Sequence, residues 1–139
     1  MKYVNTGDVL AVRLDPGEEI IASVLKIAKD EDIRFAEISA IGAVGRAVFG
    51  LYDLEEQKYH SLTFVQPLEL VSLNGNLSRK DGEPYLHLHA AFADEKGAVI
   101  GGHLNEAVIS ATCEKFSKIF DFYMGRRISE KTGLNIIDI

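Results

Sequence analysis

The chain has 139 residues, the usual length of one domain, and 47% of them are hydrophobic, so it can bury a core of its own. Its 21 acidic and 15 basic residues give a net charge of −6, which argues against a nucleic-acid-binding surface. No apolar run reaches the roughly 18 residues of a membrane span. The N-terminal residues do not read as a signal peptide and Cys113 is the single cysteine, so we expect a cytoplasmic protein without membrane contact.

The first predicted element is a helix that begins at Asp15 and ends in the charged run 29–32. Asp15 is expected to cap its N-terminus, with Pro16 in the first helical position and Glu18 completing a capping box. Apolar residues then recur at helical spacing and predict one buried face: Ile20, Ile21, Val24, Ile27 and Ala28. This helix is expected to cover one face of a sheet.

After the helix, the apolar residues repeat every second position, as strands require. Residues 33–41 alternate, and residues 46–64 read as two strands around an acidic turn at 53–57. Residues 67–78 predict a further strand, which Asn74–Gly75 interrupts as a turn or a bulge. Many strands and one long helix predict an α+β fold, and the chain shows no linker, so residues 1–139 are expected to form a single domain.

The segment "YLHLHAAFADEKGAVIGGHL", residues 85–104, contains three of the four histidines. His87 and His89 are two residues apart, so they lie on the same face of a strand. If residues 95–97 form the loop, with Gly97 in a left-handed conformation, His89 lies directly opposite His103. All three imidazoles then converge, whereas a register slip of one residue would move His103 to the other face.

Three convergent neutral imidazoles suit a divalent metal, zinc first, and leave a fourth position open for water or a ligand. Gly101 and Gly102 beside His103 leave room for a bound molecule or for close backbone approach. The alternative is that the strand histidines are half-exposed polar residues and that His103 caps a turn. His60, which has no such neighbours in the sequence, is expected on the surface.

Other chemistry has weaker support in the sequence. The polar residues that could assist a metal or act as acid or base are Glu37, Glu69, Asn105 and Glu106, but each alone is typical of a solvated or hydrogen-bonded position. The densest basic spots, Arg79–Lys80 and Arg126–Arg127, each have acidic residues within three positions. Such interleaving is typical of solvated surface charge, so we expect both pairs to be exposed and direct DNA binding to be weak or absent.

The sequence resembles the stand-alone prokaryotic members of the plant and prokaryote conserved (PPC) domain family. The resemblance covers nearly the whole chain, and its most specific part is "LHLHAAF" followed by "GAVIGGHL". It implies a mostly antiparallel, strongly bent sheet with one main helix packed on it, assembled as a homotrimer. It also implies a metal bound by His87, His89 and His103.

Plant proteins of this family carry AT-hook segments that bind the DNA minor groove, while the domain itself serves self-association and partner contact. This chain has no Arg-Gly-Arg-Pro core, and it has Pro67 where the plant motif has arginine. The fold is also similar to that of acetolactate decarboxylase, which holds zinc with three histidines. Two hypotheses follow. The chain is an interaction or regulatory module associated with DNA through a partner, or it is a metal-dependent enzyme for a small oxygen-rich metabolite that binds at the metal.

Overall fold

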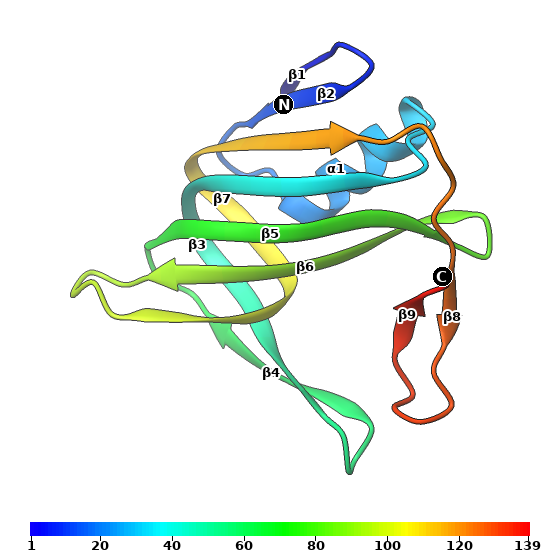
Figure 1. The fold of residues 1–139 in the computed structure, drawn as a ribbon. Coiled ribbons are helices and arrows are strands. Elements are labelled where there is room, and N and C mark those ends of the chain that lie inside the picture. The colour runs from blue at the N-terminus through cyan, green and yellow to red at the C-terminus, as the bar shows by residue number, and fades with distance from the viewer.

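A computed structural model describes all 139 residues, and Figure 1 shows one helix against a strongly bent sheet. The helix α1 spans Ile20–Asp30. The strands are β1 (Lys2–Asn5), β2 (Val9–Leu14), β3 (Ala36–Asp53), β4 (Lys58–Phe64), β5 (Leu68–Lys80), β6 (Glu83–Ala93), β7 (Val99–Ile119), β8 (Arg126–Ile128) and β9 (Asn135–Ile137). No helix in the chain combines the length and the apolarity that crossing a bilayer requires.

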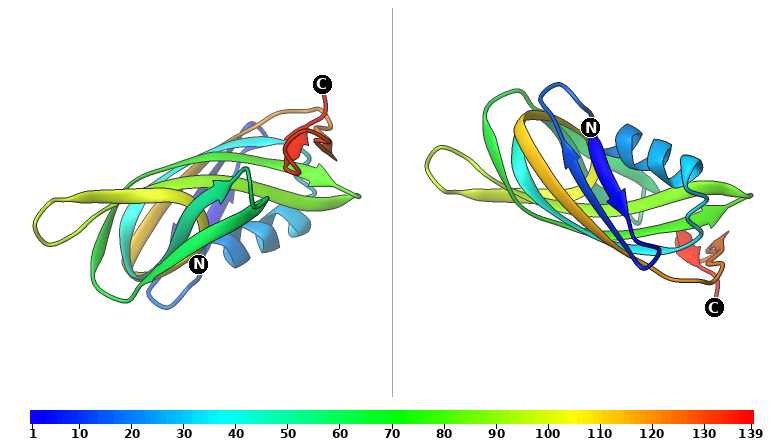
Figure 2. Two further views of the ribbon diagram at one scale, coloured as in Figure 1. Left: turned by 90° about the horizontal axis from the view of Figure 1, so that it is seen from below. Right: turned by 90° about the horizontal axis from the view of Figure 1, so that it is seen from above.

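Seven strands form one antiparallel sheet in the order β1-β2-β7-β6-β5-β3-β4, and β7 also pairs with β3. This extra pairing closes a ring of four strands, β3, β5, β6 and β7, and the two views of Figure 2 show how far β3 and β7 bend to do so. The strands β8 and β9 form a separate small hairpin at the C-terminus (Figure 1). The predicted α+β fold with a bent, mostly antiparallel sheet and a single helix is confirmed.

The core lies between α1 and the curved sheet. Ile20, Val24, Ile27 and Ala28 of the helix are buried, and Ile21 packs partly buried at the edge, so the predicted apolar face of α1 is confirmed. Along β3 the predicted alternation also holds, because Ala36, Ile38 and Ala40 are buried while the residues between them are exposed. Farther along β3, the phenyl ring of Phe49 stacks on the phenyl rings of Phe64 and Phe92, with centroids 4.9 and 5.2 Å away.

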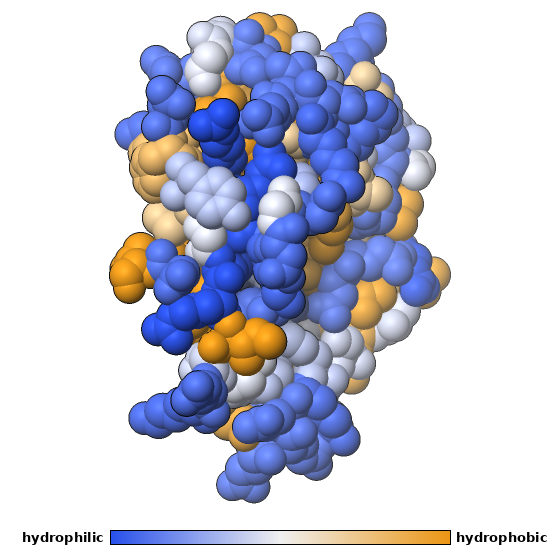
Figure 3. All heavy atoms as spheres, turned by 90° about the vertical axis from the view of Figure 1, so that its right-hand side faces the viewer, coloured by the Kyte–Doolittle hydropathy of each residue, from blue (hydrophilic) through white to orange (hydrophobic).

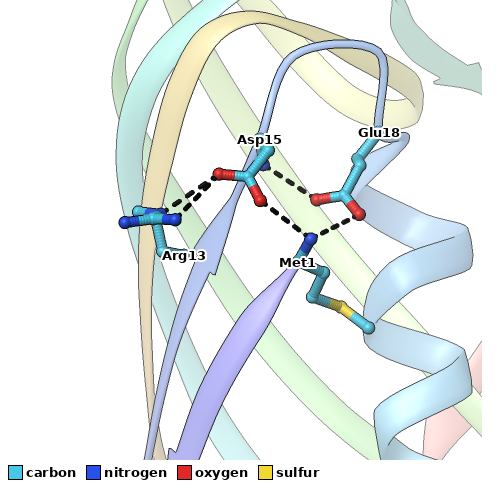
Figure 4. Close-up of polar contacts among 4 residues, drawn as sticks. All are labelled: Met1, Arg13, Asp15 and Glu18. Atoms are coloured by element: carbon cyan, nitrogen blue, oxygen red, sulfur yellow. Dashed lines mark hydrogen bonds and ion pairs between the residues drawn. The ribbon is translucent and has the colours of Figure 1, made fainter.

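The helix begins later than the capping pattern predicts. Gly17 adopts a left-handed φ of 86°, so the helix cannot include this residue. Glu19 is the actual N-cap, and its carboxylate accepts from the backbone N–H groups of Ile21 and Ala22. Glu18 does accept from the N–H of Asp15, and both carboxylates also receive the amino group of Met1 (Figure 4). These ion pairs fasten β1 to the turn before α1, so the capping-box pattern serves the turn and not the helix.

Strand β5 also differs from its prediction. Asn74 and Gly75 form neither a turn nor a bulge but lie inside the continuous strand, and the irregularity falls between Leu70 and Ser72. Gly75 is required for another reason, because a β-carbon there would overlap the backbone carbonyl of His87 on β6. The missing side chain therefore allows β5 and β6 to approach closely beside one of the histidines.

Candidate metal centre

The three histidines come from the β6–β7 hairpin in the predicted register. His89 pairs with His103 across the hairpin, and the connecting turn holds Gly97 at a φ of 76°. The carboxylate of Asp94 accepts from the backbone N–H of Lys96 and Ala98, which fixes the turn. Since directly paired residues project to the same side of a sheet, this register alone brings His103 beside the other two imidazoles.

The imidazoles of His87, His89 and His103 form a nearly equilateral triangle. Their ring centroids are 5.2, 5.3 and 5.5 Å apart, and one nitrogen from each ring lies within 4.8 Å of the others. His87 and His103 are half-buried, and His89 is exposed. His103 lies inside the strand pairing, so the alternative that it caps a turn is wrong.

This donor set fits a tetrahedral divalent ion. Two nitrogens bound at about 2.0–2.1 Å to one tetrahedral ion are about 3.3–3.4 Å apart. The Nε2 atoms of His87 and His89 are 3.3 Å apart, which is this separation and also that of a direct imidazole–imidazole hydrogen bond. The Nδ1 of His103 is buried without a hydrogen-bond partner. The rings thus present nitrogen donors to one another and need little movement to share an ion.

The surroundings favour the neutral, metal-binding form of two of these imidazoles. Burial, together with His87 and His89 beside it, lowers the pKa of His103 to about 4. Burial also lowers the pKa of His87, and the positive charge of Arg126 acts in the same direction. A lower pKa keeps an imidazole unprotonated below its ordinary titration range, so competition between proton and metal is reduced at these positions.

Close backbone packing holds His103 in place. Its strand partner on β3 is Gly50, and a β-carbon on Gly102 would overlap the carbonyl oxygen of that glycine. A β-carbon on Gly101 would likewise overlap the carbonyl of Ala90. The sequence predicts that Gly101 and Gly102 leave room either for a bound molecule or for close backbone approach, and the structure shows close backbone approach. On its open side, the ring of His103 lies against Tyr59, with centroids 4.6 Å apart.

A cleft of about 420 Å³ adjoins the site through His87. Its walls include Tyr52, Tyr59 and Tyr85, the side chain of Arg126, and residues 133–137 of the C-terminal hairpin. Figure 3 shows that the side of the molecule bearing this hairpin is mainly hydrophilic, with scattered apolar residues. The triad is therefore not an isolated surface feature but borders a space large enough for a small molecule.

The first residue of each basic pair, Arg79 and Arg126, is less exposed than the sequence predicts. Arg79 is 8% exposed and donates to the Asp32 carboxylate and to the carbonyl of Ile33. Arg126 is half-buried in the wall of the cleft, whereas its neighbour Arg127 is exposed and paired with Asp138. Arg126 is the functional candidate that sequence reasoning missed, because charge interleaving gives no information about which of two adjacent arginines turns inward.

The other predicted candidates do not join the triad. Glu106 accepts from Arg46 and Asn105 donates to Ser61, while Glu37 and Glu69 are exposed, and none of the four lines the cleft. His60 is exposed, as predicted, and its Nε2 lies 3.0 Å from a carboxylate oxygen of Glu56. The histidine centre therefore has no carboxylate among the residues of its cleft.

Comparisons with known proteins agree with this architecture. The family model of the Plants and Prokaryotes Conserved (PCC) domain matches residues 1–120. A bifunctional GlmU protein from Synechococcus is 31% identical over 105 residues, which are 75% of this chain. The chain spans only 16% of the length of that relative.

Solved structures extend the likeness over the whole fold. A metal-containing protein from Archaeoglobus fulgidus is 36% identical, with a TM-score of 0.88, over 97% of this chain and 96% of that one. A protein from Bacteroides thetaiotaomicron with a provisional description as DNA-binding is 26% identical, with a TM-score of 0.95, over 99% and 96%. Acetolactate decarboxylase from Bacillus subtilis, 16% identical with a TM-score of 0.59 over 88% and 57%, shares the fold alone.

Proposed function

This chain belongs to the plant and prokaryote conserved domain family, and from that premise we propose that residues 1–139 act as a single-domain interaction or regulatory module built around a metal. The observation that carries the proposal is the convergence of His87, His89 and His103, with ring nitrogens within 4.8 Å of one another. Imidazoles on paired strands need a specific register to converge in this way, so a shared ligand explains the arrangement better than three unrelated solvent-exposed side chains do.

We propose zinc as the metal. Three neutral imidazoles in a triangle suit a tetrahedral ion that keeps one open position, and zinc adopts that geometry without strain. The Archaeoglobus fulgidus protein, which is described as metal-containing, supports a metal in this fold. The Nε2 atoms of His87 and His89, 3.3 Å apart, give further support, because two nitrogens bound to one tetrahedral ion have about this separation.

The module is proposed to assemble as a homotrimer. Large apolar side chains remain exposed on the sheet, among them Ile41 at 58%, Val71 at 45% and Phe116 at 53%. Ile41 and Val71 line one shallow groove together, and apolar patches of this kind mark association surfaces. Ile136 and Ile137 of the C-terminal hairpin are half-buried in β9 and line the cleft, so they add little to such a surface.

Contact with DNA is proposed to pass through a partner protein. The net charge is −6, and one arginine of each basic pair is salt-bridged to a carboxylate, Arg79 to Asp32 and Arg127 to Asp138, which disfavours direct phosphate binding at these pairs. The Bacteroides thetaiotaomicron relative has a provisional description as DNA-binding, which supports an association with DNA for a complex that contains this chain. The proposed location is the cytoplasm, where the free thiol of buried Cys113 is stable.

Removal of the metal tests the module hypothesis. A structural metal stabilises the folded state by mass action, by about 4 kcal/mol at a thousandfold excess over its dissociation constant. Chelation should therefore lower the melting temperature or the trimer fraction measured by light scattering, and added zinc should restore both. If chelation removes zinc and neither quantity changes, the metal does not support the assembly and the module hypothesis fails.

A second candidate function is a metal-dependent enzyme acting on a small oxygen-rich metabolite. The observation that favours it is the cleft of about 420 Å³ beside His87. A metal with three protein ligands would supply an open position for a substrate oxygen there. In that case metal removal should abolish ligand binding and leave the trimer assembled, whereas loss of a structural metal should reduce the trimer fraction.

A further inference from the structure

Arg126 occupies an unusual position in the wall of the cleft. Its guanidinium is fixed by three hydrogen bonds, from Nε to the Ser78 hydroxyl, from Nη2 to the Asn76 side-chain oxygen and from Nη1 to the backbone carbonyl of Asn135. It also stacks over the ring of Tyr85, 4.8 Å from the centroid. The group is therefore held rigidly, with its orientation decided before any ligand arrives.

All of these partners are neutral. Arg126 forms no salt bridge, although its exposed neighbour Arg127 pairs with Asp138. A half-buried cation with neutral partners only is poorly compensated, and burial accordingly lowers the pKa of Arg126. A guanidinium has five N–H donors, of which three are used here. Two N–H groups, one on each terminal nitrogen, remain for a ligand.

The same cleft brings this cation to the side of one triad member, His87. His87 and Arg126 both line it, and no aspartate or glutamate does. A divalent metal on the three neutral imidazoles would add two more positive charges to a cleft without a single carboxylate. The chain as a whole carries a net charge of −6, so this local absence of negative charge is a feature of the cleft and not of the composition.

We propose that the cleft binds a small carboxylate anion, with the carboxylate on Arg126 and a second oxygen of the ligand directed to the metal site at His87, His89 and His103. This inference rests on the metal centre proposed above. The planar guanidinium matches a carboxylate in a two-point hydrogen bond, and the hydroxyls of Tyr59 and Tyr85 in the cleft walls suit an oxygen-rich molecule. The cleft volume of about 420 Å³ limits the ligand to a small metabolite.

The test uses glycolate, the smallest 2-hydroxycarboxylate, and its uncharged methyl ester as probes. Zinc content and the melting curve of each protein are measured first, and binding is then measured by calorimetry with the zinc-loaded protein. Glycolate should bind and methyl glycolate should not. Arg126→Gln should weaken glycolate binding by about 10- to 100-fold, the usual loss for hydrogen bonds to a charged group, while zinc remains bound.

Arg127→Gln is the matched control, since Arg127 is adjacent, exposed and outside the cleft. It should bind glycolate as the wild type does. If Arg126→Gln does not fold, Arg126→Lys and the comparison of acid with ester in the wild type replace it. Three outcomes overturn the carboxylate inference and leave the metal centre intact. They are equal binding of glycolate and its ester, equal binding of glycolate by the wild type and the Arg126 variants, and no binding of glycolate to the zinc-loaded protein. A protein that takes up no zinc overturns both.

Discussion

Replacement of Gly102 by alanine should disrupt the metal centre without touching a ligand. A β-carbon at this position would lie at least about half an ångström closer to the carbonyl oxygen of Gly50 than these two atoms can approach without a clash. That oxygen is backbone, so the strands β3 and β7 must separate to admit the methyl group. Overpacking of this kind costs about 1–3 kcal/mol of unfolding free energy.

The displacement also acts on the neighbouring ligand. His103 follows Gly102 directly and pairs with Gly50, so its imidazole moves with the strand. Metal–ligand distances tolerate only about 0.2 Å of error, and a shift of half an ångström exceeds this. We therefore expect Gly102→Ala to weaken zinc binding by at least about tenfold, the lower end of the effect of disturbing the groups that position a ligand.

Gly97→Ala on the same hairpin is the matched control. Gly97 has a left-handed φ of 76° with open space around it, so alanine there costs about 1 kcal/mol of backbone strain without moving a strand. Denaturant unfolding should show both variants to be less stable than the wild type, and equilibrium dialysis with zinc should separate them. Zinc binding by Gly102→Ala equal to that of Gly97→Ala would refute the view that close packing of β3 and β7 positions His103.

The remaining predictions concern the buried lysine, the helix cap and DNA. Lys115 is 1% exposed, and burial lowers its pKa from 10.5 to about 8. Between pH 8 and pH 10.5 the unfolded state therefore binds more protons than the folded state, and the stability of the wild type rises with pH in this window. Lys115→Met should therefore stabilise the protein at pH 7 by up to about 3 kcal/mol, and this advantage should shrink towards pH 10; an advantage that does not change with pH would contradict it. Glu19→Ala should cost about 1–2 kcal/mol in denaturant unfolding, because the carboxylate caps α1 and also accepts from the backbone N–H of Ala107, and a cost equal to that of an exposed control such as Glu95→Ala would refute both roles. A shift assay on AT-rich duplex at about 150 mM salt should show no tight complex with the chain alone, and nanomolar affinity would overturn the charge argument.

The histidine hairpin could be predicted from the sequence because local rules decide it. The period of two places His87 and His89 on one face, and a turn with Gly97 near its end selects the register that pairs His89 with His103. The apolar face of α1 and the alternation in β3 follow from periodicity in the same way. Each of these features depends only on residues close together in the chain.

The features that the sequence did not predict depend on contacts between distant residues. The N-cap of α1 is Glu19 and not Asp15, because Asp15 and Glu18 bind the amino group of Met1 and Gly17 forms a left-handed turn before the helix. Arg126 turns inward because Ser78 and Asn76 on β5, about fifty positions earlier, offer acceptors to its guanidinium. Local composition contains no sign of such partners, so the wall of the cleft could be found only in three dimensions.

The most direct test of the central claim is the zinc content of the purified protein and of two histidine variants. We predict about one zinc per chain in the wild type, most of it lost in His103→Ala, because a bound ion needs all three imidazoles. His60→Ala should keep the content of the triad, because His60 belongs to a separate group with Asp53 and Glu56 and gives no ligand to the three-histidine site. A wild type that contains no metal and takes up none on dialysis against zinc, or equal zinc in both variants, would contradict a metal centre at His87, His89 and His103.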